Sequence, residues 1–165
     1  MASTARNTPR VRGARKRADP SASDFLLANS PFYLMAQTNG RYMLAMERSL
    51  KAVGMDLPRW RVLMVLHEKS PSTVSEIASR SAMKLSTMTK VAQRLAREGF
   101  VELSANRQDA RSTDVHLTAK GAEAVTTIRL AASRVFQRAT GEFSDADIAT
   151  LNHLLLRLDA GLQEL

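Results

Sequence analysis

Residues 86–98 read STMTKVAQRLARE, and this stretch decides the fold class of the chain. At helical spacing its apolar side chains point to one side, and they are Met88, Val91, Ala92 and Leu95. Most of its polar side chains point to the other side, and they are Ser86, Thr87, Lys90, Gln93, Arg94 and Arg97. The second face carries cations and hydroxyls but no carboxylate before Glu98. The pattern therefore predicts an amphipathic helix whose outer face suits a polyanionic partner.

A β-hairpin with a basic tip is predicted directly after this helix. Gly99 ends the helix, and residues 100–103 open a strand that the alternating residues 115–117 match after a polar loop. The loop carries Arg107, Asp109 and Arg111. Taken alone, such a loop is equally consistent with an ordinary solvated turn.

Two shorter helices are predicted before the amphipathic one. Apolar residues over 60–66 indicate a buried helix that ends near Pro71, because a residue before proline disfavours helix. Residues 73–76, TVSE, have the spacing of a capping box, which starts a helix reaching about Ser81. Three short helices followed by a hairpin are the element order of a winged helix-turn-helix. Since its last helix fits the DNA major groove, this order predicts DNA binding.

Longer helices are predicted on both sides of the winged head, which comprises residues 55–118. One runs over 31–53, and its polar centre could face a cavity or allow a close backbone approach at Gly40. Others are expected over 119–140 and 145–165. The last one repeats apolar residues at steps of three and four, namely Ile148, Leu151, Leu155, Leu158, Leu162 and Leu165. A seam of only about 18 residues is not stable alone, so it packs on its own domain or on a partner's helices.

The composition indicates one globular domain, since the chain has 165 residues with 44% hydrophobic and 24% charged. No run of about 18 apolar residues is present, and no apolar stretch follows the first arginines, which argues against a membrane span and a secretory signal. The absence of cysteine excludes disulfides, thiolate metal sites and cysteine nucleophiles. We therefore expect a cytoplasmic protein.

The net charge of +8 favours a polyanionic partner, either nucleic acid or an anionic membrane surface. Two segments carry the excess: residues 1–20 hold six basic residues and one acid, and residues 73–120 hold eight basic residues and five acids. Residues 1–23 lack periodicity and large apolar side chains, so we expect a disordered basic tail. That tail is either a solubilising terminus or a sequence-independent phosphate contact.

Five motifs in order resemble the MarR (multiple antibiotic resistance regulator) family. They are residues 57–63 (LPRWRVL), 83–90 (MKLSTMTK), 95–101 (LAREGFV), 109–111 (DAR) and 117–121 (LTAKG). The Asp-x-Arg of the hairpin followed by Leu-Thr-x-x-Gly is the most specific part. The resemblance covers roughly residues 30–165. The chain departs from the family at Lys84 and Leu85, where relatives often have a short polar capping residue.

The resemblance implies a mostly α-helical protein with a small β-hairpin wing, acting as a homodimeric transcriptional regulator on double-stranded DNA. Residues 24–54 and 119–165 would form a helical dimerisation region around the winged helix-turn-helix domain over 55–118. We interpret it as a repressor on a pseudo-palindromic operator. By resemblance, Arg111 reaches the minor groove and Asp109 steadies the wing. The candidate DNA-binding residues are Ser86, Thr87, Thr89, Lys90, Arg94, Arg107, Asp109 and Arg111.

Many members of this family release DNA when a small aromatic or phenolic acid binds between the dimerisation helices and the winged head. By resemblance, the candidate ligand-binding residues are Ser30, Tyr33, Arg41, Trp60, Arg61 and His67. Aromatic walls and guanidinium groups are what an aromatic carboxylate needs. The alternative is that Trp60 and Tyr33 are core residues and that the arginines are solvated.

Neither an enzyme nor a metal protein is indicated. The histidines His67, His116 and His153 lack paired metal-ligand spacing, and the chain has no phosphate-binding glycine loop or nucleophile elbow. We therefore expect no catalytic residues, no cofactor and no metal. Two other classes stay open: an architectural protein that coats or bends DNA without sequence preference, and an interaction module that uses the C-terminal leucine seam.

Overall fold

The computed structural model of this protein describes residues 13–109 and 111–164, and the chain divides into two compact units after Glu47. The first unit contains helix α1 (Ala14–Ala18), the 3-10 turn η1 (Leu27–Asn29) and most of helix α2 (Pro31–Lys51). Among the described residues, no helix has the length and apolar character needed to cross a membrane.

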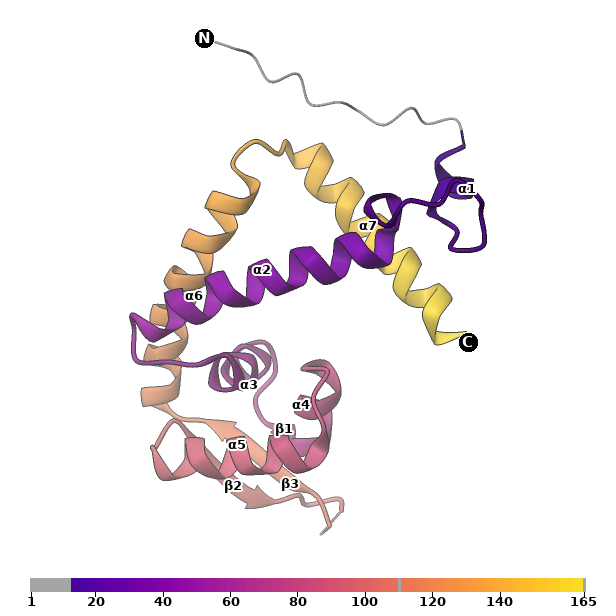
Figure 1. Ribbon diagram of the computed structural model, residues 1–165. Coiled ribbons are helices and arrows are strands. Elements are labelled where there is room, and N and C mark those ends of the chain that lie inside the picture. Colours follow the sequence, from indigo (N-terminus) through magenta and orange to yellow (C-terminus); the bar gives the residue numbers. More distant parts are fainter. Residues whose placement is uncertain (1–12, 110, 165) are drawn as a thin grey trace. The chain divides into compact units, whose positions relative to one another are not determined.

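The second unit holds the remaining helices and a small sheet (Figure 1). Its elements are α3 (Leu57–Glu68), β1 (Ser72–Thr73), α4 (Val74–Arg80), α5 (Leu85–Arg97), β2 (Val101–Ala105), β3 (Thr113–Leu117), α6 (Ala119–Thr140) and α7 (Asp145–Gln163). The strands are antiparallel in the order β1-β3-β2, with Val101 opposite Leu117 and Ala105 opposite Thr113. The predicted fold class, mostly helical with a small β wing, is confirmed.

Side-chain caps confirm the predicted starts of α4 and α6. The Thr73 hydroxyl accepts from the backbone N–H of Glu76 at 3.1 Å, and the Glu76 carboxylate accepts from the N–H of Thr73 at 2.7 Å. This completes the predicted capping box before α4. The Thr118 hydroxyl accepts from the N–H of Gly121 at 3.0 Å at the start of α6. Polar side chains at these positions satisfy the amides that a helix start leaves unpaired.

The core of the second unit is built from α3, α4, α5, α6 and the sheet. Its fully buried side chains include Val62, Leu63, Leu66, Ile77, Met88, Leu95, Val115 and Ile128. Met88, Ala92 and Leu95 come from the face of α5 that the sequence predicts to be apolar, so this face holds the helix on the head. Helix α6 starts close to the sheet at Gly121, where an added Cβ would lie 2.2 Å from the Phe100 carbonyl oxygen. Only glycine fits there.

Two details of the head differ from the sequence expectations. The wing belongs to a three-stranded sheet rather than a hairpin alone, because Ser72 and Thr73 pair with β3. Two residues are too few to show the alternation by which a strand is recognised. Helix α5 begins at Leu85 and ends at Arg97, one residue earlier at each end than predicted, because Lys84 takes the N-cap position without a side-chain hydrogen bond.

The predicted disordered tail, residues 1–23, divides into two parts. Residues 1–12 lie outside the described residues, whereas residues 14–18 form the helical turn α1. The sequence ARKRA is made of strong helix formers, and Gly13 enters the turn with a φ of 83°. Farther along, an added Cβ at Gly40 would meet no described atom within 4 Å, so the close backbone approach considered for this glycine is not made within the described chain.

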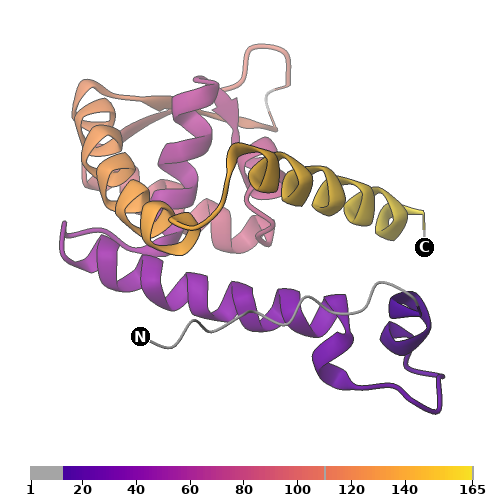
Figure 2. The same ribbon diagram turned by 90° about the horizontal axis from the view of Figure 1, so that it is seen from above.

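Helices α6 and α7 leave large apolar side chains uncovered. Figure 2 shows them as consecutive helices joined by a turn. None of the described residues of α7 is buried, and its exposed leucines are Leu151, Leu154, Leu155, Leu156 and Leu162. On α6, Leu130 and Phe136 are exposed as well. The sequence predicts that the leucine seam packs either on its own domain or on a partner's helices. Within the described chain, the seam of α7 is not buried against its own domain.

Candidate nucleic-acid interface

The outer face of α5 carries the predicted base-reading residues. Ser86, Thr87, Thr89 and Lys90 are all exposed, away from the side chains that this helix buries. The Thr89 hydroxyl donates to the Leu85 carbonyl oxygen at 3.0 Å, and its oxygen keeps acceptor capacity. The face therefore offers hydroxyls and one ammonium group at the surface of a helix narrow enough for the major groove.

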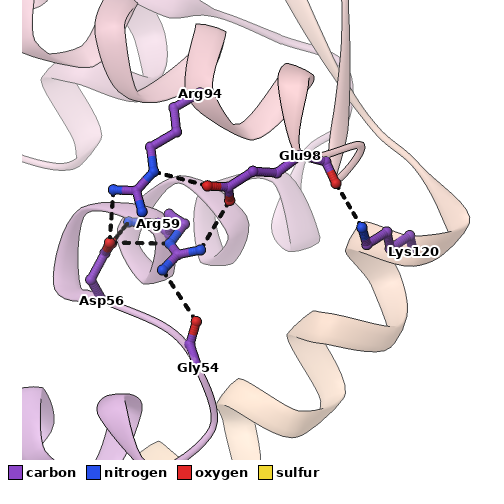
Figure 3. Close-up of polar contacts among 6 residues, drawn as sticks. All are labelled: Gly54, Asp56, Arg59, Arg94, Glu98 and Lys120. Carbon is purple, nitrogen blue, oxygen red and sulfur yellow. Dashed lines mark hydrogen bonds and ion pairs between the residues drawn. The ribbon is translucent and has the colours of Figure 1, made fainter.

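A closed ring of four charged side chains fixes the C-terminal end of α5 (Figure 3). Arg94 donates from Nε to Glu98 at 2.9 Å and from Nη1 to Asp56 at 3.2 Å. Arg59 of α3 donates from Nη1 to Glu98 at 2.9 Å and from Nε to Asp56 at 3.1 Å. We refer to Asp56, Arg59, Arg94 and Glu98 as the charge ring. It joins α5 to the start of α3, and the Arg94 guanidinium points into it.

Further bonds tie the charge ring to its surroundings. The Arg59 side chain is only 14% exposed and also donates from Nη2 to the Gly54 carbonyl oxygen at 3.1 Å. Asp56 accepts from the backbone N–H of Arg59 and so caps α3. Lys120 donates to the Glu98 carbonyl oxygen at 2.7 Å from the first turn of α6. Because charge-assisted bonds are stronger than neutral ones, α5 is held at this end from two sides.

The charge ring shifts two pKa values in the direction that pairing requires. Burial by itself would raise the pKa of Glu98, but the hydrogen bonds from Arg94 and Arg59 outweigh burial and lower it. The pKa of Arg94 is raised, first by its hydrogen bond to Glu98 and then by the charge of Asp56. Both shifts favour the charged forms of Glu98 and Arg94.

Asp109 organises the tip of the wing. Its carboxylate accepts from the backbone N–H of Arg111 at 3.0 Å and from the Ser112 hydroxyl at 2.9 Å. These two bonds, the one from Arg111 first, lower the pKa of Asp109. The side chains of Arg107 and Arg111 are exposed on the same loop, which extends past the helices in Figure 1. This is the geometry that a steadying role for Asp109 requires.

Sequence reasoning missed Asn106, which supports the same tip from inside the loop. Its side-chain amide donates to Asp114 at 2.8 Å, and its Oδ1 accepts from the backbone N–H groups of Gln108 and Asp109, each at 2.9 Å. Asparagine commonly forms such side-chain turns, so its place at the start of a polar loop is a signal that could have identified it.

Three predicted ligand-binding residues lie on or beside α2 in the first unit. Ser30 is buried, and its hydroxyl accepts from the backbone N–H of Tyr33 at 3.5 Å. Tyr33 is half-buried and Arg41 is exposed. The Ser30 hydroxyl thus has a capping role at the start of α2, which is independent of any ligand.

The other three predicted ligand-binding residues lie on α3 in the second unit. Trp60 and Arg61 are half-buried, and His67 is exposed. The Nε2 atom of His67 lies 3.4 Å from Nη1 of Arg129 on α6. Trp60 and His67 are seven residues apart on one helix, so they share a face. Two basic side chains, His67 and Arg129, are therefore brought together between α3 and α6, and Trp60 lies about two turns away on the same face of α3.

A hollow of about 640 Å³ lies elsewhere in the second unit, between the segment leading into α4 and the base of the wing. Its lining includes Lys69, Ser72, Glu76, Asn106, Asp114 and His116. None of the predicted ligand-binding residues on α3 lines it. Its polar groups pair with one another, Lys69 with Glu76 at 2.8 Å and Asn106 with Asp114 at 2.8 Å. A polar wall of this kind does not match the aromatic site that the sequence predicts.

Metal-ligating side chains are dispersed in the part of the chain that the structure describes, where no group of three or more could hold a metal ion. His116 interacts with the Ser104 hydroxyl at 2.9 Å within the sheet. This arrangement matches a hydrogen-bonding role for His116.

Comparisons with known proteins agree with this geometry. A sequence model of the MarR family matches residues 55–113. Over 156 residues the chain is 36% identical to the HTH-type transcriptional repressor IacR of Pseudomonas putida, and the alignment covers 93% of each protein.

Solved structures share the fold at lower identity. The PcaV transcriptional regulator of Streptomyces coelicolor, in complex with its natural ligand, has a TM-score of 0.72 and 21% identity, with 82% of this chain and 95% of that one covered. BpsR of Bordetella bronchiseptica, whose DNA binding is regulated by 6-hydroxynicotinic acid, has a TM-score of 0.69 and 19% identity, with 77% and 96% covered.

Proposed function

Because the chain belongs to the MarR family of transcriptional regulators, we propose that it is a homodimeric repressor that binds a pseudo-palindromic DNA operator. The protein is a DNA-binding regulator of the winged helix-turn-helix type and not an enzyme. The observation that carries the proposal is the outer face of α5, where exposed hydroxyls and Lys90 accompany a basic wing. Since its partner is chromosomal DNA, we expect the protein in the cytoplasm.

Each candidate DNA-binding residue has a role in this proposal. Ser86, Thr87, Thr89 and Lys90 contact base edges and phosphates in the major groove. Arg107 and Arg111 contact the backbone or the minor groove, and Asp109 holds the loop that carries them. Arg94 acts differently, because its guanidinium already donates to Asp56 and Glu98. We propose that Arg94 positions α5 through the charge ring.

The proposed dimer partner is a second copy of the chain. Support comes from α7, which exposes five leucines and buries none of its described residues. Leaving so much apolar surface in water is unfavourable, and a second copy would cover it. We propose residues 24–54 and 119–165 as the dimerisation region. Light scattering is expected to give twice the chain mass of 18.2 kDa, and a monomeric mass would contradict the dimer.

The proposed effector is a small aromatic or phenolic acid. Support comes from BpsR, whose DNA binding is regulated by 6-hydroxynicotinic acid, and from Trp60, Arg61 and His67 on α3. Ser30, Tyr33 and Arg41 are the further candidates. A thermal-shift panel of hydroxybenzoates, hydroxycinnamates and pyridine carboxylates tests this, and we expect one compound to raise the melting temperature and weaken operator binding. A panel without any stabilising compound would count against this effector class.

Selection of sheared genomic DNA by the purified protein at moderate salt tests the proposal as a whole. We expect the retained fragments to share a two-fold site with half-sites one helical turn apart. Fluorescence anisotropy on that site then measures affinity. Retention that follows only DNA length and salt would favour the alternative, an architectural protein without sequence preference.

A further inference from the structure

An exposed leucine stands at the start of α5. Among the described residues of the winged head, 55–118, only two large hydrophobic side chains are exposed, Leu85 at 53% and Leu103 at 37%. The other exposed large hydrophobic side chains belong to residues 26–44 and to the segment that begins with α6. Leu85 therefore belongs to the winged head and not to the proposed dimerisation region.

The position of Leu85 places it at the edge of the outer face of α5. It is the first residue of the helix and directly follows the N-cap residue, Lys84. Thr89 lies one turn farther along, on the same strip of the helix, and its hydroxyl donates to the Leu85 carbonyl oxygen. On its other side Leu85 borders Met88 and Ala92, which are buried, whereas Lys90 projects from a different side of the helix. Leu85 is thus the one large apolar side chain of this helix that is exposed, and it lies next to the hydroxyl of Thr89.

DNA offers a specific partner for such a group. Base edges in the major groove present hydrogen-bond donors and acceptors, and the apolar group among them is the 5-methyl of thymine. In a helix-turn-helix, residues at the N-terminal end of the recognition helix contact the base edges. Contact between Leu85 and a thymine methyl would remove both apolar groups from water.

We propose that Leu85 is a specificity-determining residue that contacts the 5-methyl group of one thymine in each operator half-site. This inference rests on the proposed function, because it requires that α5 enters the major groove. It adds a preference for thymine that the hydroxyl and ammonium groups of the same face do not provide.

Replacement of thymine by deoxyuridine tests the contact directly. Deoxyuridine keeps base pairing and every hydrogen-bonding group of thymine and lacks only the methyl. Anisotropy titrations use the operator obtained by genomic selection, with a single thymine of the operator replaced at a time. We expect one position in each half-site to lose affinity about fourfold, the value for burying one methyl-sized group. Other positions should change little.

The matched variants are Leu85→Ala and Leu103→Ala. Alanine favours helix, so Leu85→Ala should keep the head folded, and its melting temperature checks this. We expect Leu85→Ala to bind the thymine and deoxyuridine operators equally, whereas Leu103→Ala stays sensitive to the missing methyl.

Two results would overturn the inference while leaving the proposed function intact. One is an operator in which no thymine responds to deoxyuridine. The other is an unchanged deoxyuridine response in Leu85→Ala. Retention of DNA without any sequence preference would instead overturn the proposed function, and the contact with it.

Discussion

The two ends of α5 are built in opposite ways. At the C-terminal end, Arg94 and Glu98 belong to the charge ring, and Lys120 holds the Glu98 carbonyl oxygen. At the N-terminal end, Lys84 provides no side-chain cap and Leu85 is half exposed to solvent. The C-terminal end is bonded to α3 and α6, whereas the N-terminal end carries exposed side chains.

In the proposed DNA complex, the C-terminal end of α5 positions the helix on the head, and its N-terminal part contacts the DNA bases. Ionic hydrogen bonds have directional geometry, so the charge ring fixes where α5 lies on the head. The proposed DNA-contacting residues of α5 lie one to three turns away, so they can be substituted without loosening that attachment. Site geometry of this kind is more exact when rigid elements support it. Substitutions at the charge ring, in the wing and on the outer face of α5 can therefore be expected to affect stability and DNA binding differently.

Among these substitutions, Arg59→Ala should weaken the attachment of the C-terminal end of α5 most. It removes the side-chain bonds to Asp56, Glu98 and the Gly54 carbonyl, and leaves Arg94 as the one cation of the ring that pairs with the two carboxylates. We expect the free energy of unfolding to fall by about 2 kcal/mol, because a partly buried charge loses its partner. Urea unfolding followed by circular dichroism measures it.

The matched control is Arg97→Ala, which removes an exposed arginine at the C-terminal end of α5. Its unfolding free energy should change by no more than about 0.5 kcal/mol. Equal losses of unfolding free energy in Arg59→Ala and Arg97→Ala would show that the charge ring adds no stability of its own.

Arg111→Ala provides a comparison in which neither end of α5 is altered. We expect operator affinity to fall by about 1 to 3 kcal/mol. The wing should keep its shape, because Asp109 accepts from the backbone N–H of Arg111 rather than from its side chain. Anisotropy gives the affinity and urea unfolding should be unchanged. Unaltered affinity would remove Arg111 from the interface.

Arg94→Ala and Lys90→Ala distinguish a positioning residue from a phosphate contact. We expect Arg94→Ala to weaken operator binding by about 1 kcal/mol while the slope of log affinity against log salt stays the same. Lys90→Ala should reduce that slope by about 1.8, which is about 0.9 for the Lys90 of each subunit in the proposed dimer. Anisotropy at several salt concentrations measures both. A similar loss of slope in Arg94→Ala would mean that Arg94 contacts phosphate.

Low pH should weaken the attachment of the C-terminal end of α5 less than Arg59→Ala does. The folded pKa of Glu98 is lowered, so this carboxylate stabilises the head above its unfolded pKa of about 4.3. That stabilisation is lost as the pH falls through the lower folded pKa. Glu98→Gln should therefore lose less stability than the parent chain between pH 5 and pH 3, measured by urea unfolding.

Other carboxylates contribute to the same acid response, which is why the difference between the two chains is the useful quantity. Hydrogen bonds from Lys69 and then from the Thr73 N–H lower the pKa of Glu76 to about 2, and the pKa of Asp109 is lowered as well. Both are common to the parent chain and Glu98→Gln. Identical acid responses in the two chains would contradict a role for Glu98.

The sequence predicted most of the fold because its signals are local. The capping box at 73–76 and the division of 86–98 into an apolar and a polar face depend on residues one or two turns apart. The wing residue Asp109 was also identifiable from a short motif. Strand β1 was not, since two residues carry no periodicity and acquire their conformation by pairing with β3.

The closure of the charge ring could not have been predicted. The pairs Asp56–Arg59 and Arg94–Glu98 are local, but the bonds that join one pair to the other span 38 and 39 residues of chain. In the sequence, Arg94 and Lys90 are both basic residues of the polar face of 86–98, and both were candidates for DNA contact. Part of their difference is the local bond from Arg94 to Glu98, and the rest arises when α3 brings Asp56 to within 3.2 Å of Arg94, across 38 residues of chain. Charge pairs of this kind follow from packing.

By itself, the sequence determined which segments form helices, which face of α5 is polar, and the family to which the protein belongs, because each rests on short-range patterns. The tertiary structure decided which cations of that face are committed to other side chains and which remain available. It also showed that Leu85 stays exposed, since only the packed head reveals which apolar residues it covers. Exposure and pairing depend on distant segments meeting, and local patterns do not carry that information.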